Sequence, residues 1–533
     1  MRNLNFYWAL ALSTLSGSLW FLAVTPFDLS VLAWIAAVPM FMAIERAGSY
    51  RRALFLGWWA GVIETAGGFY WLIDVMRRFA DFPWLAAAAV FFLFCAARAL
   101  IFLLFTAAVY PVRRRSMLPM TLLAPIVMVS CEFVVPQIFP CGQWISQAWN
   151  PLVIQISELT GPLGVTALLM MVNGAIYDLT VNVRAARNPT IACATIFAAA
   201  LIFGMVRMRA IDEAVAQAPR LKVGLVQPNF PYSIDGEFSR DEALRQLTAL
   251  QEQSRRLEQA GAELLVWSEG SYPVGLPRDF SADFPQDSLA MIRRGFSVPT
   301  LIGAELFDAA HDDAFNSAVL LDKNGKVAGS YDKVRLLAFG EYVPGIDYFP
   351  WLRKLLPAGA GRFTAGTGPG VVSLQEPQGQ IRLGPVICYE DILQGFLRGV
   401  GQLHPNLLVN LTSDSWFGAD TEPWQHLALA VFASIELRVS MVRAVNSGVS
   451  AFIDPNGRVQ KKTYADDPYR HPRAADGLLV SVPIMPGGKT AFVAVGYLFV
   501  YLCLAATLII LAAALVDARR ARKTAGAIGR RSP

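Results

Sequence analysis

The sequence predicts a multi-pass α-helical membrane bundle, followed by an α/β sandwich domain and a closing membrane helix. Composition gives the first indication: 54% of the 533 residues are hydrophobic and only 16% are charged, against about 25% charged in a typical soluble domain. The order of apolar and polar segments along the chain gives the second. Long apolar segments occupy residues 1–210, short β-rich and polar helical segments alternate over residues 220–485, and residues 490–517 are apolar again.

Eight segments are long and apolar enough to be interpreted as membrane spans, since about 30 Å of hydrocarbon requires about 20 apolar residues. Seven form the first domain and one follows the sandwich: 6–24, 29–44, 53–75, 84–109, 118–135, 152–176, 190–206 and 491–516. The first segment has no small-residue cleavage site, and further spans follow it directly, so we interpret it as a span and not as a signal peptide.

Arginine clusters predict the orientation of this bundle. They mark every second loop, at residues 46–52, 113–115 and 184–187, and the tail at residues 518–533 is also basic. Because cytoplasmic loops are enriched in Lys and Arg, we expect both termini in the cytoplasm and residues 220–485 outside it. Arg77 and Arg78 are the exception, partly offset by Asp81. We therefore interpret the arginine clusters behind the net charge of +5 as signals of membrane topology, and no nucleic-acid partner is expected.

Four ionisable residues lie in or near the apolar segments: Glu64, Arg98, Glu132 and Glu158. Such residues are costly in a membrane and often functional. Pairing between helices and a chemical role are both open for each of them.

The α/β domain is predicted from short strands bounded by turn residues. The expected strands are 221–227, 263–267, 300–306, 316–321, 327–331, a strand ending at Cys388, 406–410, 449–454 and 478–483. Residues 239–260 carry apolar positions at helical spacing and predict an amphipathic helix. Asn-Gly at the centre of residues 322–326 predicts a hairpin.

Three polar residues follow predicted strands: Glu269, Lys333 and Cys388. Strand ends at one edge of an α/β fold converge on the cleft where ligands bind. There a carboxylate can take the thiol proton, a thiolate can attack a carbonyl carbon, and an ammonium can stabilise the oxyanion. The alternatives stay open for each residue alone: a small buried cysteine, a solvated turn lysine and a helix-capping acid.

Cysteine usage favours a reactive Cys388. Of six cysteines, four fall in spans and Cys141 lies in an uncharged aromatic loop, so Cys388 alone belongs to the α/β domain. A single thiol in an exported domain fits a retained nucleophile. A Cys141–Cys388 disulfide is the alternative. The sequence contains no zinc-ligand pattern, and no metal site is expected.

Several motifs carry a family resemblance. Trp-Ser-Glu at 267–269, Tyr-Asp-Lys at 331–333 and Ile-Cys-Tyr-Glu at 387–390 resemble the Glu–Lys–Cys triad of the nitrilase superfamily. Phe-Gly-Glu-Tyr-Val-Pro at 339–344, Asp-Ser-Trp-Phe-Gly at 414–418 and Pro-Trp-Gln-His at 423–426 resemble the bacterial apolipoprotein N-acyltransferase family more specifically. The arrangement of seven spans, nitrilase-like domain and closing span is also similar. One departure is Arg335-Leu336-Leu337-Ala338, where the family usually has His-Leu-Val-Pro.

The resemblance implies an α/β nitrilase-like (αββα sandwich) domain with Glu269, Lys333 and Cys388 as catalytic residues. It implies ping-pong transfer of a fatty acyl chain from a phospholipid, through a thioester on Cys388, to the N-terminal diacylglyceryl-cysteine of an apolipoprotein. The expected setting is the bacterial inner membrane with a periplasmic catalytic domain, a monomer and no cofactor. Supporting roles are implied for Glu341, which orients Lys333, and for Glu390, which shapes the turn. The backbone N–H of Tyr389 is a candidate oxyanion donor.

Aromatic residues near these motifs are candidates for substrate binding. Trp416, Phe417 and Trp424 form one apolar patch, and Phe349 and Trp351 lie in the segment 345–361, which has the composition of an interfacial lid. Ordinary core packing is an equal alternative for these aromatics. His426 is interpreted as a structural histidine.

Two other functions remain open at this stage. A membrane-tethered nitrilase-type amidase would use the same three residues, although seven spans exceed what a tether requires. A transporter with an accessory domain would show paired, broken, Gly/Pro-rich helices, which the sequence does not contain.

Overall fold

The computed structural model describes residues 4–79, 81–116, 118–230, 239–311, 313–338, 340–342, 348, 363–376, 379–417, 421–464 and 476–529. The chain forms two compact units. Unit 1 comprises Met1–Tyr70, Leu85–Met205 and Val495–Pro533, and unit 2 comprises Trp71–Trp84 and Val206–Ala494. Each unit is described below by itself.

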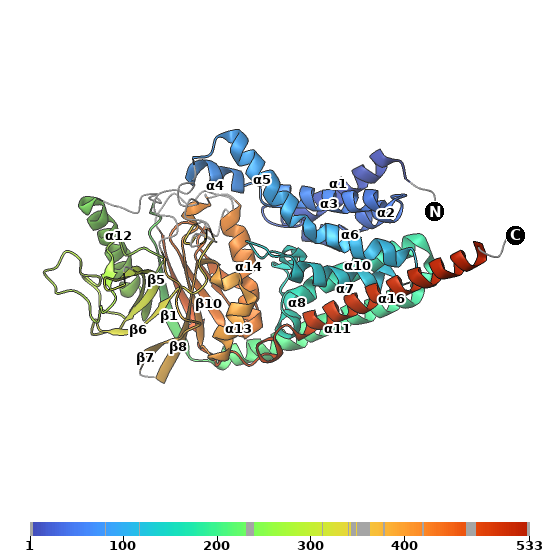
Figure 1. The fold of residues 1–533 in the computed structure, drawn as a ribbon. Coiled ribbons are helices and arrows are strands. Elements are labelled where there is room, and N and C mark those ends of the chain that lie inside the picture. Colours follow the sequence, from blue (N-terminus) through green and yellow to red (C-terminus); the bar gives the residue numbers. More distant parts are fainter. Residues whose placement is uncertain are drawn as a thin grey trace. The chain divides into compact units, whose positions relative to one another are not determined.

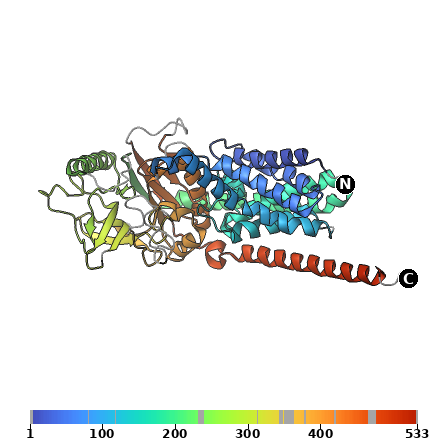
Figure 2. The ribbon, with the colours of Figure 1, turned by 45° about the horizontal axis from the view of Figure 1, so that its top comes forward.

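Unit 1 is helical, as Figure 1 shows. Its elements within the described residues are α1 (Phe6–Leu22), η1 (Ser30–Trp34), α2 (Val38–Glu45), α3 (Tyr50–Gly68), α5 (Trp84–Arg98), α6 (Leu100–Arg113), α7 (Met120–Val134), η2 (Gln143–Gln147), α8 (Pro151–Ile154), α9 (Ser157–Thr160), α10 (Leu163–Val181), most of α11 (Val183–Gln217) and α16 (Leu498–Gly529). The last of these runs as one long helix (Figure 2).

Four helical segments among the described residues are long and apolar enough to cross a membrane: Trp84–Arg113, Leu163–Val181, Val183–Gln217 and Leu498–Asp517. Three shorter segments are also apolar: Phe6–Leu22, Ser30–Glu45 and Met120–Val134. Not every expected span is one continuous helix: within 53–75 helix α3 ends at Gly68, and 491–516 is divided between Ala491–Val495 and α16. Residues 152–176 contain two short helices before α10, because Gly161 takes a left-handed φ of 67° and Pro162 follows it. The number of spans stays a prediction.

Some buried polar side chains in unit 1 complete the hydrogen bonds of helix ends and loops. The Asp178 carboxylate accepts from the backbone N–H of Met120 at 3.0 Å and of Thr121 at 2.9 Å, and so caps α7. Glu132 accepts from the Gln143 N–H at 3.0 Å. These contacts satisfy backbone groups that have no water partner in an apolar environment.

Arg98, another of the four ionisable residues in the apolar segments, also makes contacts that hold elements together. Its guanidinium donates to the Gln137 side chain and to the Cys141 carbonyl, and lies 4.0 Å from the Glu64 carboxylate. These interactions attach the loop after α7 to the neighbouring helices. They agree with the first of the two roles left open for Glu64 and Arg98, which is pairing between helices.

Unit 2 contains two sheets. The first has the order β13-β1-β2-β4-β5-β6, with β3 paired to β4; its strands are β1 (Arg220–Gln227), β2 (Leu264–Trp267), β3 (Leu276–Pro277), β4 (Thr300–Asp308), β5 (Asp313–Leu321), β6 (Val327–Asp332) and β13 (Asp476–Pro483). The second has the order β12-β11-β10-β9-β8-β7; its strands are β7 (Val372–Glu376), β8 (Gly379–Ile387), β9 (Leu407–Thr412), β10 (Ser440–Val445), β11 (Ala451–Ile453) and β12 (Val459–Lys462).

Parallel strands form the centre of each sheet: β1, β2 and β4 in the first, and β8, β9 and β10 in the second. Central parallel strands are buried on both faces and are therefore apolar throughout. Leu407–Thr412 is such a strand, with all of its residues buried. The expected hairpin is confirmed, because Asp322–Gly325 joins the antiparallel β5 and β6 and Gly325 has a φ of 83°.

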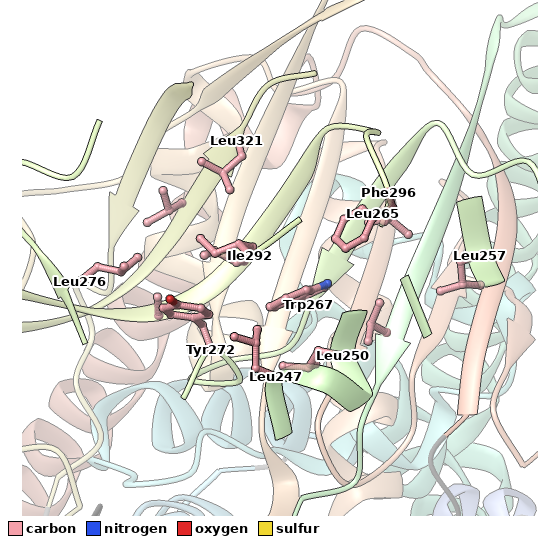
Figure 3. Close-up of a cluster of buried hydrophobic side chains, with 14 of the residues drawn as sticks. Leu247, Leu250, Leu257, Leu265, Trp267, Tyr272, Leu276, Ile292, Phe296 and Leu321 are labelled. Carbon is pink, nitrogen blue, oxygen red and sulfur yellow. The ribbon is translucent and has the colours of Figure 1, made fainter. Parts of the chain in front are cut away.

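Helices cover both outer faces, so the unit has an αββα architecture (Figure 1). The first sheet carries α12 (Arg240–Gln259), and the second carries α13 (Gln394–Gln402) and α14 (Glu422–Leu437). Ser239 caps α12 by accepting from the Glu242 N–H at 3.2 Å. Figure 3 shows the core beneath α12, in which Leu247 and Leu250 pack against Trp267 of β2.

Two further short helices remain, α4 and α15. The short helix α4 (Leu72–Phe79) belongs to unit 2 although it lies between α3 and α5 in the sequence. Trp71, just before it, donates from Nε1 to the Gln425 amide oxygen at 3.0 Å and stacks edge-on against Phe417 with ring centroids 5.5 Å apart. The remaining element is α15 (Ala491–Val495).

Candidate active site

The three polar residues expected at strand ends lie where the sequence places them. Glu269 comes two residues after β2, and Lys333 and Cys388 directly follow β6 and β8. Strands β2 and β4 are parallel, and β6 runs in the same direction because β5 is antiparallel to both of its neighbours. Glu269 and Lys333 therefore leave the first sheet at the same edge.

Lys333 joins two carboxylates. Its Nζ donates to Glu269 Oε1 at 3.0 Å and to Glu341 Oε1 at 2.8 Å, and the side chain is 1% exposed. Asn316 Nδ2 donates to the same two oxygens at 2.8 and 2.9 Å. Charge-assisted hydrogen bonds in a water-poor site are strong, so the ammonium and both carboxylates are held in one fixed group.

Cys388 occupies a strained turn. Its φ is 55°, in the left-handed region that residues with a Cβ rarely adopt, and η4 (Cys388–Ile392) begins at this residue. Asn410 Nδ2 donates to the Cys388 carbonyl at 2.9 Å. Such strain costs about 1–3 kcal/mol and persists only where neighbouring contacts enforce it. The turn directs the chain away from β8 at the cysteine.

The charges of the site are coupled to the thiol. Burial raises the pKa of Cys388 well above its ordinary value, Glu269 raises it further and Lys333 opposes them. Burial alone lowers the pKa of Lys333, but the charges of Cys388, Glu269 and Glu341 carry it well above the usual value. The lysine is therefore an ammonium, while burial and the Glu269 charge favour the protonated thiol at Cys388.

Glu269 is the candidate acceptor of the thiol proton. Burial raises the pKa of Glu269, the Lys333 charge lowers it and the Glu341 charge raises it again. Moving a proton from Cys388 to Glu269 leaves the net charge of the group unchanged. A proton transfer of this kind avoids creating an uncompensated buried charge.

Glu390 connects the cysteine turn to the lysine loop. Its Oε2 accepts from the Ile387 N–H and from the Tyr331 hydroxyl, both at 2.8 Å. Its Oε1 accepts from the Val334 and Arg335 N–H groups at 2.8 and 2.9 Å. A single buried carboxylate thus fixes the turn of Cys388 against the segment that follows Lys333.

The loop that departs from the family pattern, residues 335–338, is held through its backbone. Besides the Arg335 N–H, the Leu336 carbonyl accepts from the Tyr389 hydroxyl at 2.9 Å and the Leu337 N–H donates to Glu341 Oε2 at 2.8 Å. Backbone groups make these contacts whatever the side chains are, which explains how the loop tolerates a different sequence.

The expected substrate contacts are described only in part. Phe417 and Trp424 are buried, and Lys462 Nζ lies 4.4 Å from the centre of the Trp424 ring. The backbone of Trp416 lies in η5 (Asp414–Trp416). Phe349 and Trp351 lie outside the described residues. The six cysteines are free, which excludes the Cys141–Cys388 disulfide.

Sequence reasoning missed two groups that contact Glu269. Asn316 lies on β5 and bridges both carboxylates, and the Ser413 N–H donates to Glu269 Oε2 at 3.1 Å. The signal for Asn316 is an amide in the middle of a strand that is mostly apolar. A backbone N–H such as that of Ser413 leaves no signal in a sequence.

Comparisons with known proteins extend over nearly the whole chain. Residues 16–175 match the family model described as apolipoprotein N-acyltransferase N-terminal domain, and residues 222–467 match the one described as carbon-nitrogen hydrolase. The apolipoprotein N-acyltransferase of Geobacter metallireducens is 29% identical over 523 residues, covering 94% of each chain. That of Bdellovibrio bacteriovorus is 29% identical over 477 residues, covering 86% of each.

Solved structures with a similar fold cover about half of the chain. A mutant of the amidase of Nesterenkonia sp. AN1, from the nitrilase superfamily, is 16% identical, with 54% of this chain and 98% of that chain covered and a TM-score of 0.36. A Saccharomyces cerevisiae member of that superfamily is 14% identical, with 50% and 90% covered and a TM-score of 0.34.

Proposed function

The chain belongs to the apolipoprotein N-acyltransferase family and is an acyltransferase with a nitrilase-superfamily domain, and we propose that Cys388 carries its acyl group as a thioester. The donor is a membrane phospholipid, and the acceptor is the α-amino group of the N-terminal diacylglyceryl-cysteine of an apolipoprotein. One observation supports this assignment most directly: Cys388 on its left-handed turn is electrostatically coupled to a lysine that two carboxylates hold.

In the first half-reaction Glu269 removes the thiol proton and the Cys388 thiolate attacks the ester carbonyl of the phospholipid. The Lys333 ammonium stabilises the tetrahedral oxyanion, because a fixed cation is most effective where charge develops in a dry site. The intermediate collapses to a thioester. The leaving lysophospholipid alkoxide takes the proton from Glu269.

In the second half-reaction the α-amine of the acceptor attacks the thioester. Its pKa in a free chain is about 7.7–8.0, so much of it is neutral near physiological pH. Glu269 accepts a proton from the amine, the amide forms, and the thiolate leaves and recovers its proton. Splitting an ester-to-amide exchange through a thioester replaces one difficult step by two easier ones.

The supporting residues have separate roles. Glu341 orients Lys333 through its 2.8 Å hydrogen bond, and Glu390 sets the turn of the nucleophile through its four donors. The Tyr389 N–H is a second oxyanion donor. Trp416, Phe417 and Trp424, together with Phe349 and Trp351, contact the acyl chains.

The chain is a bacterial membrane protein, as its relatives and its apolar helices indicate. Its finer location is part of the proposal: a monomer of the inner membrane with eight spans, both termini in the cytoplasm and the catalytic domain in the periplasm. Both substrates are then membrane lipids that reach the site laterally. Water must be kept from the thioester, because hydrolysis would release the acyl chain as a free fatty acid.

Product analysis tests the reaction. Purified protein is incubated with phospholipid and a diacylated lipopeptide, and the triacylated lipopeptide and the free fatty acid are quantified by mass spectrometry. The proposal requires a lipopeptide that gains one acyl group in step with loss of phospholipid. Free fatty acid as the main product, with an unchanged lipopeptide, would identify a hydrolase.

A further inference from the structure

A buried group of charged side chains lies behind the turn that carries Cys388. Its central member is His426 of α14, which is 4% exposed. His426 Nε2 lies 3.0 Å from Asp391 Oδ1, and Nδ1 lies 3.0 Å from Asp414 Oδ1. Arg443 of β10, which is fully buried, donates to the other oxygen of Asp391.

This geometry determines the charge of the histidine. A carboxylate can only accept hydrogen bonds, and a neutral imidazole has a single N–H. Bonds from both ring nitrogens to carboxylates therefore need protons on both. Burial and Arg443 lower the pKa of His426, but Asp391 and Asp414 raise it to about 10.

The two carboxylates belong to the two arms of the active site. Asp391 lies in η4, three residues after Cys388. Asp414 begins η5, and the residue before it, Ser413, donates its backbone N–H to Glu269 Oε2 at 3.1 Å. The imidazolium thus connects the turn that holds the thiol to the loop that holds the base.

We propose that His426 is a positioning residue, whose imidazolium fixes the distance between the Cys388 thiol and the Glu269 carboxylate by bridging Asp391 and Asp414. This inference rests on the proposed function, in which proton transfer from Cys388 to Glu269 starts each acylation. Misplacement of reacting groups by about 1 Å can slow a reaction by about 100-fold.

A metal site is the competing interpretation of the same residues. Potential ligand atoms of Asp414, Glu422 and His426 lie within 4.8 Å of one another. However, both nitrogens of His426 lie 3.0 Å from carboxylate oxygens, and a ring protonated at both nitrogens, as proposed, has no lone pair for a metal. Burial, with Asp414 as the second cause, raises the pKa of Glu422 well above its ordinary value, which favours the neutral acid over a metal-binding carboxylate.

Nitrogen-15 NMR of histidine-labelled protein tests the charge in the intact chain. The chain contains four histidines, and the signals of His426 are identified by their loss in His426→Gln. The groups that face His426 are Asp391, Asp414, Glu422 and Arg443. We expect imidazolium signals for His426 from about pH 6 to about pH 9, where an ordinary histidine is mostly neutral above about 6.5. A neutral ring at about pH 8 would overturn the proposal.

Kinetics test the positioning role. The rate of Cys388 acylation by phospholipid is measured under single-turnover conditions for His426→Gln, Asp414→Asn and the double variant. A glutamine cannot donate from two opposite nitrogens, so we expect each single variant to acylate about 100-fold more slowly. The double variant should be no slower, because residues acting as one unit are not additive. The matched control is His311→Gln, whose ring is 72% exposed and whose loss should leave the rate unchanged.

A second readout separates this proposal from the proposed function. Alkylation of Cys388 by iodoacetamide, followed by peptide mass spectrometry, reports thiol activation even if no acyl thioester forms. We expect slower alkylation in His426→Gln than in wild type at each pH. Wild-type rates of both acylation and alkylation in His426→Gln would overturn the role of His426. If the variants do not fold, the NMR measurement on wild-type protein decides.

Discussion

At the scale of single residues, the site depends on one ammonium that two carboxylates share. Lys333 is within 3.0 Å of Glu269 Oε1 and 2.8 Å of Glu341 Oε1, so it supplies positive charge without leaving either acid unpaired. Asn316 has no charge, yet it contacts the same two oxygens. The amide separates two like charges and keeps both directed at the lysine.

Replacing Asn316 tests this arrangement. Asn316→Ala removes two hydrogen bonds to charged groups, each worth about 1.5–3 kcal/mol. Part of that loss should appear in the transition state, and we expect acylation of Cys388 to slow by about 10- to 100-fold. The rate is measured by intact-mass spectrometry with phospholipid in excess.

The control is Asn324→Ala, at an exposed position in the β5–β6 turn, which should acylate at the wild-type rate. An Asn316→Ala protein that acylates as fast as wild type would show that the amide only fills space.

The positions of Glu269, Lys333 and Cys388 at strand ends were predictable from the sequence, whereas the other groups that contact Glu269 were not. Glu269, Lys333 and Cys388 each follow a predicted strand within two residues, and this local pattern together with the family resemblance indicated them. Asn316 and Ser413 reach Glu269 from segments 47 and 144 residues away. Contacts of this kind depend on how strands are ordered in a sheet, which no local pattern encodes.

At the scale of elements, the strands position the site by how closely their backbones approach. Gly303 of β4 faces the turn after β2: a Cβ there would lie 2.2 Å from the Ser268 carbonyl oxygen and 2.8 Å from the Cα of Glu269. The absence of a side chain at this one position lets the turn that carries the base pack directly on the next strand.

Gly303→Ala is expected to displace Glu269. Because the clash is with backbone, which cannot rotate away, the turn must move, and acylation of Cys388 should fall by about 100-fold. Thermal unfolding in detergent, followed by intrinsic fluorescence, should show a lower Tm as well.

Gly368→Ala is the matched control, since a Cβ at Gly368 would have no atom within 4 Å. Equal behaviour of the two variants, in rate and in Tm, would contradict the close approach of β4 and the Glu269 turn.

Some elements escaped prediction for identifiable reasons. Every residue of α14 is buried, so the helix has no solvent-facing side of charged residues from which its helical period could be predicted. In β10 the fully buried Arg443 interrupts an apolar run. In unit 1 the pair Gly161-Pro162 marks the break within the apolar segment 152–176, but length and hydropathy alone predict one continuous span there.

At the scale of the whole molecule, the two units suit two different environments. Apolar helices of unit 1 suit a hydrocarbon environment, and unit 2 has the buried core and the charged site of a water-soluble enzyme. The family relationship spans both units. Arginine clusters in alternate loops are the feature that predicts which side of the membrane each unit faces.

Thiol labelling tests the orientation. Cysteines are introduced at Asp279 of unit 2 and at Arg184 of unit 1, both of which are exposed. A membrane-impermeant maleimide applied to intact spheroplasts should modify Asp279→Cys and not Arg184→Cys. Permeabilised spheroplasts should show modification of both. Labelling of Arg184→Cys alone before permeabilisation would place the catalytic domain in the cytoplasm.

The central claim is that Cys388 carries the acyl group. Intact-mass spectrometry after incubation with phospholipid, and without an acceptor, measures this directly. We predict a mass increase of one acyl chain that neutral hydroxylamine removes and that is absent in Cys388→Ala. An unmodified wild-type protein, or the same adduct on Cys388→Ala, would contradict it.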